Sequence, residues 1–296
     1  MLISVITTTY NNSHEIEKLF HTLEKQSEFN FEWIIIDDGS ASREQPILKE
    51  IQSARAPFEI KLYHQSNQGK HIALNCAFAK VKGDVTIIID ADDRPLPDMI
   101  KTINDYWTPS RLADNQLAII TFERGKNINS PLLGLPVKCV RANYTKYRYQ
   151  NSLYGDYAET FKSSVLKQYR FPQYANEKFL SEDYVENDLG SKYDSIFVDH
   201  IIYLAAYRPE GLTKNIRKIE WDSPQGTFAT CKRKVNNMYL SPKMQIKFLI
   251  KYCLFGFRNK ISLSEQLAYV DHKILYVLCL PVSLLIYLTF LVRFGR

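Results

Sequence analysis

The sequence lacks several features that would place it in common protein classes. Its cysteines are odd in number and widely spaced, without a CxxC pair: Cys76, Cys139, Cys231, Cys253 and Cys279. This pattern argues against a disulfide framework or a zinc site, and it suits a reducing compartment. Internal repeats and low-complexity stretches are also missing, and residues 2–7 predict a strand rather than a signal peptide.

The composition is that of a globular protein with a basic tail. Of 296 residues, 45% are hydrophobic and 24% are charged, which is enough for a sizeable core and argues against extended disorder. This length allows one large domain or two small ones. The formal net charge is +6, and most of the positive excess lies in the last third of the chain.

Strand and helix patterns alternate over the first 100 residues. Apolar runs predict strands at 2–7, 31–36, 60–63 and 86–89, and amphipathic patterns predict helices near 13–26, from about 44, and near 70–81. Such alternation predicts a mainly parallel sheet with right-handed crossovers. Residues from 101 to about 220 are less regular, with a strand at 117–122. We expect a catalytic domain over 1–225 and a tail over 226–296.

Three carboxylates follow the fourth predicted strand within four residues, at Asp90, Asp92 and Asp93. Ligands of doubly wound sheets bind outside the carboxyl ends of the strands, so these side chains lie where a site is expected. Like charges this close repel unless a cation compensates them, and Mg²⁺ prefers carboxylates together with substrate phosphates. The alternative for such a cluster is a solvated Asp-rich turn.

Two other strand ends carry polar side chains. Thr7-Thr8-Thr9-Tyr10-Asn11 follows the first strand, and Asp37-Asp38-Gly39-Ser40 follows the second. With the Asp cluster they suit a nucleotide-diphosphate pocket, in which Tyr10 stacks on a base and an Asp accepts the imide N–H of uracil. Taken singly, these segments could also be a helix cap and an ordinary turn.

These motifs resemble those of the family 2 glycosyltransferases, which have the GT-A fold. The matching segments are Ser4-Val-Ile-Thr-Thr-Thr-Tyr10-Asn11, Trp33-Ile-Ile-Ile-Asp37-Asp38-Gly39-Ser40, Asn67-Gln-Gly69-Lys70 and Asp90-Ala-Asp92-Asp93. The resemblance is clear over residues 1–100, weaker to about 220, and does not extend over the tail. One departure is Thr8, which stands where the family commonly has a proline. The resemblance implies a Rossmann-like α/β domain that binds a nucleotide-diphospho-sugar.

The resemblance also implies roles for the strand-end residues. Thr8 and Tyr10 match the turn that lines the base pocket, and Asp38 matches the carboxylate that contacts the base. Lys70, or else His71, is the best match for a basic residue that meets the diphosphate. The metal, Mn²⁺ or Mg²⁺, and the ribose are assigned to the DxD segment: Asp92 to ribose and metal, Asp90 and Asp93 to metal.

A catalytic base is expected about ninety residues after the DxD motif. Glu182-Asp183 fits, with Asp183 taking the proton of the acceptor hydroxyl and Glu182 as its neighbour or as an acceptor contact. The pair could also simply begin a helix. Asp156 is a further candidate ligand for sugar hydroxyls, or a helix cap. The basic segment 207–218 would suit a loop that closes over a diphosphate, although a solvated surface loop fits equally well.

The tail combines a basic amphipathic stretch, residues 243–260, with an uncharged apolar run, residues 274–292. The run is close to the roughly 20 residues that span a bilayer, but Pro281 makes a kinked or re-entrant helix equally compatible. Together the two stretches predict membrane association at the cytoplasmic face, peripheral or C-terminally anchored. Each alone could instead be a core helix or an oligomer contact, so a homo-oligomer formed through the tail stays open.

The sequence therefore predicts an inverting, metal-dependent glycosyltransferase, hexosyl- or N-acetylhexosaminyl-specific. Its expected donor is a UDP-sugar, favoured over a GDP-sugar, and its acceptor a glycan or polyprenyl-linked molecule in bacterial surface polysaccharide synthesis. The alternative is a catalytically inactive, membrane-attached sugar-binding or scaffold protein. A nucleotidyltransferase is disfavoured because the first strand is not followed by a Gly-rich basic loop. Acidic side chains at the strand ends disfavour nucleic-acid binding.

Overall fold

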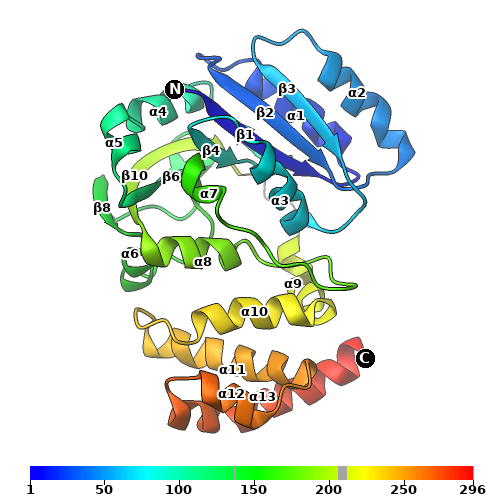
Figure 1. The fold of residues 1–296 in the computed structure, drawn as a ribbon, viewed down its shortest axis with the longest axis vertical. Helices are drawn as coiled ribbons and strands as arrows, with labels where there is room; N and C mark the ends of the chain where they lie inside the picture. Colours follow the sequence, from blue (N-terminus) through cyan, green and yellow to red (C-terminus); the bar gives the residue numbers. More distant parts are fainter. Residues whose placement is uncertain (137, 206–211, 296) are drawn as a thin grey trace. The chain divides into compact units, whose positions relative to one another are not determined.

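The computed structural model describes residues 1–136, 138–205 and 212–295. The first hundred residues alternate strands and helices as predicted, with element ends shifted by at most three residues (Figure 1). The elements are β1 (Ile3–Thr9), α1 (Ser13–Leu23), β2 (Phe31–Asp37), a short 3-10 helix (Ser42–Glu44), α2 (Gln45–Ser53), β3 (Glu59–His64), α3 (Lys70–Lys80) and β4 (Val85–Ile88).

The middle of the chain completes the sheet with shorter and less regular elements. These are β5 (Arg94–Pro95), α4 (Met99–Tyr106), α5 (Pro109–Ala113), β6 (Leu117–Asn127), β7 (Ser130–Pro131), β8 (Cys139–Asn143), α6 (Tyr144–Gln150), β9 (Ala158–Lys162), α7 (Ser163–Leu166) and β10 (Asp194–Leu204). The predicted strand at 117–122 is confirmed, and it continues five residues further than the apolar run.

The strand order is β3-β2-β1-β4-β9-β6-β10-β5, with β7 beside β6 and β8 beside β10. The pairs among β3, β2, β1 and β4 are all parallel, but β9 runs antiparallel to both β4 and β6. The parallel pairing predicted from the first hundred residues is therefore confirmed for these four strands. β6 and β10 are also parallel, and the antiparallel strands make the complete sheet mixed. The regular alternation of strands and helices ends at β4, and β9 enters the sheet in the antiparallel direction after a long irregular stretch.

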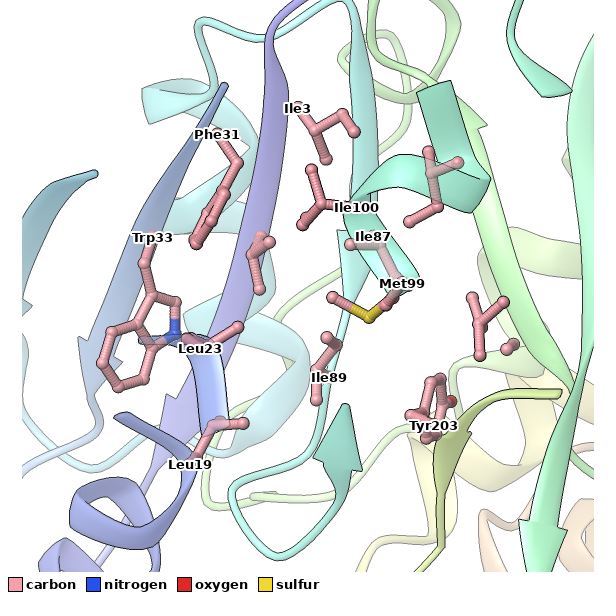
Figure 2. Packing of buried hydrophobic residues seen from close by; sticks show 14 of the residues in the cluster. Ile3, Leu19, Leu23, Phe31, Trp33, Ile87, Ile89, Met99, Ile100 and Tyr203 are labelled. Atoms are coloured by element: carbon pink, nitrogen blue, oxygen red, sulfur yellow. The ribbon is translucent and has the colours of Figure 1, made fainter. Parts of the chain in front are cut away.

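Helices cover both faces of the parallel half. The hydrophobic core of one face joins α1, α2 and α4 to β1, β2 and β4, and α3 packs on the opposite face (Figure 1). Figure 2 shows how Leu19 and Leu23 of α1 lie beside Trp33 of β2, and how Met99 and Ile100 of α4 lie over Ile87. The predicted apolar face of the first helix is thus confirmed as its buried face.

The chain divides into two compact units. Residues 1–170 with 189–207 form the first unit, and residues 171–188 with 208–296 form the second. The second contains the first turns of α8 (Asp183–Lys192) and all of α9 (Leu212–Asp222), α10 (Pro224–Lys234), α11 (Pro242–Arg258), α12 (Leu263–Tyr269) and α13 (Lys273–Phe294). The predicted division at residue 225 falls inside this unit.

The second unit has its own core of aromatic and apolar side chains. Cys231, Val235 and Leu249 are buried there with Tyr252, and Trp221 is enclosed nearby by aromatic residues of α13. Within the described part of the chain, α13 is the one helix long and apolar enough to cross a membrane, and only 17% of its most apolar window is buried.

Candidate active site

The ends of β1, β2 and β4 meet at one edge of the sheet. The Asp38 N–H, just after β2, donates to the Thr9 carbonyl at 2.8 Å, and the Ile89 N–H, just after β4, donates to the Ile6 carbonyl at 2.9 Å. The predicted convergence of the three polar turns is therefore confirmed. It follows from parallel pairing, which brings the carboxyl ends of neighbouring strands to the same edge.

The turn after β1 presents an exposed aromatic ring beside buried hydroxyls. Tyr10 is 53% exposed, Thr8 is half-buried, and Thr9 is buried. Asn11 adopts a positive φ of 51°, which asparagine tolerates, and its side-chain oxygen accepts the Ala41 N–H at 2.8 Å. The turns after β1 and β2 are thus tied together, and the Tyr10 ring is left free to meet a planar ligand.

A buried hydroxyl in this turn escaped the sequence analysis. Thr9 Oγ1 is inaccessible to solvent and finds no hydrogen-bond partner among the side chains and backbone that the structure describes. Buried polar groups are seldom left in this state. Thr9 lies in a run of three threonines, and nothing in the sequence distinguishes its burial from that of Thr8.

The two carboxylates at the end of β2 have different surroundings. Asp37 is buried and accepts the Ser40 N–H at 3.0 Å and Gln45 Nε2 at 2.8 Å, with His64 Nδ1 at 3.0 Å. Burial alone would raise the pKa of Asp37, but these hydrogen bonds outweigh it and lower the pKa. Asp37 is therefore held as an ion that organises the turn.

Asp38 braces the segment that leads into α3. Its carboxylate accepts Gln65 Nε2 at 2.7 Å, the Gln68 N–H at 2.9 Å and the Gly69 N–H at 2.8 Å. Gly39 has a φ of +78°, and a Cβ on it would lie 2.6 Å from Asn67 N, so a glycine is required for this approach. The predicted base contact of Asp38 remains a prediction, because the structure assigns this carboxylate a bracing role.

Cations surround the carboxylates after β4. Lys70, the first residue of α3, places Nζ 2.5 Å from Asp90 Oδ1, and the carboxylate is about half-exposed. Coulombic attraction to Lys70 lowers the pKa of Asp90 against the opposing effect of burial. His71 is buried instead, and burial lowers its pKa although the charge of Asp38 opposes the shift. Of the two predicted basic residues, Lys70 pairs with Asp90 of the Asp turn at a partly exposed position, whereas His71 is buried.

Arg124, near the end of β6, is a site residue that the sequence analysis missed. Its Nη2 lies 3.2 Å from the buried Asp93, its Nη1 lies 3.5 Å from the exposed Asp156, and its guanidinium covers the Tyr203 ring at 5.4 Å. Burial opposes the charge, but Tyr203 and the carboxylates raise the pKa of Arg124 overall. The available signal was a Glu-Arg pair directly after an apolar strand.

The segment before β9 is held by a partly buried ion pair. Glu159 accepts Tyr144 OH at 2.9 Å and lies 3.3 Å from Arg148 Nη1, whose guanidinium covers the rings of Tyr144 and Tyr157. Burial raises the pKa of Glu159, although Arg148 acts against it. This scaffold fixes the loop that carries Asp156, the predicted sugar ligand.

The predicted base, Asp183, is the first residue of α8 in the second unit. Its carboxylate forms an ion pair with the buried Lys234 of α10, while Asp188 of the same helix pairs with Arg233 Nη1 at 2.8 Å. The alternative that Glu182-Asp183 begins a helix is thus confirmed, and the role of Asp183 as the base stays a prediction. The predicted basic loop, 207–218, lies partly outside the described residues, and its later part forms the start of α9.

A family model and several known proteins match this chain. The model for glycosyl transferase family 2 matches residues 4–172, which is more than half of the sequence. The chain belongs to this family. The sequence-based resemblance is therefore confirmed, and the match includes the three strand ends and the Asp turn.

Curated relatives are similar to part of this family 2 chain. An uncharacterized glycosyltransferase of Nostoc sp. is 33% identical over 110 residues, which are 37% of this chain and 34% of that protein. An undecaprenyl-phosphate 4-deoxy-4-formamido-L-arabinose transferase of Pseudomonas fluorescens is 28% identical over 142 residues, 47% of this chain and 40% of that protein. The chain thus spans well under half of these relatives.

Solved structures share the fold over nearly the whole chain. S. aureus TarS, also solved with UDP-GlcNAc, matches with a TM-score of 0.60 at 16% identity, covering 100% of this chain and 88% of that one. A Pyrobaculum calidifontis mannosyltransferase solved with GDP-Man and Mn²⁺ matches at 0.57 and 15%, covering 99% and 82%. The predicted GT-A fold is confirmed, and so is a helical C-terminal region.

The carboxylates after β4 fit a metal only in part. Across the described ranges, no three His, Cys, Asp or Glu side chains are gathered as a ready metal site. Asp93 is engaged by Arg124, and Asp90 by Lys70 at an accessible position. A Mg²⁺-type site needs only one or two carboxylates if substrate phosphates supply further ligands. Asp90 and Asp92 are partly exposed, whereas Asp93 is buried.

Proposed function

We propose that this family 2 glycosyltransferase moves a sugar, a hexose or N-acetylhexosamine, from a UDP-sugar to a glycan or polyprenyl-linked acceptor, with inversion. The observation that carries the proposal is the edge where β1, β2 and β4 end, with the exposed Tyr10 after β1 and, after β4, Asp90 in its accessible pair with Lys70. The undecaprenyl-phosphate in the name of one relative supports a lipid-linked acceptor. A second relative, a putative teichuronic acid biosynthesis glycosyltransferase of Bacillus subtilis, supports surface polysaccharide synthesis. The UDP-GlcNAc complex of TarS supports the donor class.

In this proposal the donor lies along the strand ends. Thr8 and Tyr10 would line the base, Asp38 would contact it while bracing the 65–69 segment, and Asp92 would hold the ribose. Lys70 would turn from Asp90 to the diphosphate when the donor binds. Mn²⁺ or Mg²⁺, held by Asp90 and Asp92 with Asp93 nearby, would stabilise negative charge on the diphosphate.

The transfer needs one proton acceptor. Asp183 would remove the proton of the acceptor hydroxyl while the hydroxyl oxygen attacks the anomeric carbon of the donor sugar. The bond between that carbon and the diphosphate oxygen breaks at the same time, and its electron pair leaves with the diphosphate. Lys234, which forms an ion pair with Asp183, would hold this carboxylate in place. Glu182 and Asp156 would contact sugar hydroxyls of the acceptor or donor.

The primary test is nucleotide release over a panel of UDP- and GDP-sugars, with and without Mn²⁺, in the presence of lipid-linked and soluble glycan acceptors. We expect turnover with a UDP-sugar that requires the divalent ion. Binding of UDP without turnover for any donor would favour the alternative, an inactive membrane-attached sugar-binding protein.

The base assignment has a matched control on the same helix. Asp183→Asn should leave UDP affinity unchanged and lower transfer by about 10² to 10⁴. Asp188→Asn breaks the neighbouring ion pair between α8 and α10 and should leave transfer within about threefold. Equal losses in both variants would show that the pairing of α8 with α10 matters, and not a base at Asp183.

The proposal places the enzyme at the cytoplasmic face of the cell membrane, where a polyprenyl-linked acceptor is accessible. Support comes from the basic stretch of α11 and from the exposed apolar surface of α13. Co-sedimentation of the full chain with membranes, followed by protease access to residues 1–225 from the cytoplasmic side, tests both parts of this placement.

A further inference from the structure

Helix α13 packs along its whole length against the other helices of the second unit. Tyr276, Cys279 and Ser283 are buried on its inner face, and Ser283 Oγ donates to the Ile250 carbonyl of α11 at 3.1 Å. At its C-terminal end, Trp221 Nε1 of α9 donates to the Gly295 carbonyl at 3.1 Å. The inner face is therefore a structural part of this unit.

The opposite face of α13 is apolar and exposed. Its exposed aliphatic side chains have exposed fractions from 47% to 90%, and five of them follow one another at intervals of three, four or seven residues: Ile274, Leu278, Leu285, Leu288 and Val292. Charged residues stand only at the ends of this helix, Lys273 and Arg293, and both are exposed. A continuous aliphatic surface of this kind marks an interaction site.

A transmembrane orientation conflicts with what packs on the inner face. Ser283 lies at the middle of α13 and contacts Ile250, so the next residue, Lys251, lies level with the helix centre. Lys251 forms an ion pair with Glu220 of α9. If α13 spanned a bilayer, this ion pair would be carried to the middle of the hydrocarbon, where charged groups are costly.

We propose that α13 lies flat in the interface of an anionic bilayer, with the Ile274–Val292 face immersed and its inner face still on α11. The inference rests on the proposed membrane attachment and specifies its geometry. Lys273 and Arg293 would meet anionic headgroups at the two ends of the helix. A second copy of the chain fits this face less well than a lipid surface does. Because α13 carries no acidic residue, two copies of it packed parallel or antiparallel would bring cationic helix ends together.

Surface substitutions test the face without opening the core. In sedimentation with vesicles of phosphatidylcholine and phosphatidylglycerol in equal parts, Leu278→Glu/Leu285→Glu should lower the partition coefficient at least about tenfold. Ile128→Glu, the same change at an exposed residue of the first unit, should leave it unchanged. Vesicles of phosphatidylcholine alone should bind the wild-type chain more weakly. Circular dichroism confirms that each variant is folded.

Depth measurements distinguish a flat helix from a spanning one. With Cys76 and Cys139 replaced by serine, spin labels at Ile274→Cys, Leu278→Cys, Leu285→Cys and Val292→Cys should report equal, shallow depths. Deep labels at 278 and 285 with shallow labels at both ends would overturn the flat geometry alone. Absence of vesicle binding by the wild-type chain would overturn the attachment itself, as would self-association through this face in place of lipid binding.

Discussion

The two edges of the parallel half-sheet hold carboxylates that differ in burial: one is enclosed by the fold and the other is partly exposed to solvent. At the edge where the strands begin, Glu32 is almost fully buried and accepts Ser4 Oγ at 2.5 Å, the Lys82 N–H at 2.7 Å and the ammonium of Lys61. At the edge where they end, Asp90 is 45% exposed and has a partly exposed lysine, Lys70, as its partner.

This contrast separates structural charge from charge that can serve a ligand. The donors that surround Glu32 come from Ser4, Lys61 and Lys82 of the fold itself, so the carboxylate has no capacity left for an external group. The Lys70–Asp90 pair remains in contact with solvent, and an exposed ion pair contributes little to stability. It can therefore be broken at small cost when a diphosphate and a metal ion arrive.

The largest expected effect is on stability, at the edge where the strands begin. Glu32→Ala leaves the mostly buried Lys61 without its main partner, and it should lower the free energy of unfolding by about 3–5 kcal/mol. Glu59→Ala is the matched control, because the exposed Glu59 pairs with the same Lys61 at 3.0 Å and should cost less than about 1 kcal/mol. Urea unfolding measures both; equal costs would remove the distinction between the two edges.

The stabilisation from Glu32 should depend on pH. Burial alone would raise the pKa of Glu32, but hydrogen bonds from Lys61, Ser4 and the Lys82 N–H outweigh it and lower the pKa. Its contribution is therefore complete above the unfolded pKa, about 4.3, and is lost as the pH falls through the lower folded pKa. Urea titrations should show the stability gap between wild type and Glu32→Gln closing below about pH 4; a constant gap would contradict this.

At the edge where the strands end, the expected effect is on ligand affinity. EDTA, or Asp92→Asn, should weaken UDP binding at least about tenfold, about 1.4 kcal/mol, with little change in unfolding. Asp105→Asn, which removes an exposed carboxylate of α4, should change neither quantity. Calorimetric titration with UDP measures the affinities. UDP affinity that is insensitive to both treatments would refute metal-assisted binding.

The smallest expected effect is the coupling free energy between Lys70 and Asp90. A double-mutant cycle on Lys70→Met and Asp90→Asn should give about 0–1 kcal/mol in unfolding, similar to the cycle on the exposed pair Lys101–Asp105, also at 2.5 Å. Lys70→Met should nevertheless weaken UDP binding, and Lys101→Met should not. A coupling of several kcal/mol would make Lys70–Asp90 a structural pair like that of Glu32.

Local patterns were sufficient for most of the first hundred residues. Hydrophobic periodicity predicted the strands and α-helices up to β4, though not β5 or the start of α4, and parallel pairing then required the turns at Thr9, Asp38 and Asp90 to share an edge. The antiparallel entry of β9 was not predictable in this way. Its position depends on which strand edges remain unpaired after β4 has formed, and no local signal encodes that.

What the sequence determined by itself is the order of elements to β4, the strand-end site and an apolar tail, because each depends on residues that are neighbours in the chain. Only the tertiary structure decided that Arg124 pairs with Asp93, that residues 171–188 pack with the later helices, and that one face of α13 is buried while the other is exposed. These depend on contacts between distant segments, which strand order and packing fix after the local elements are formed.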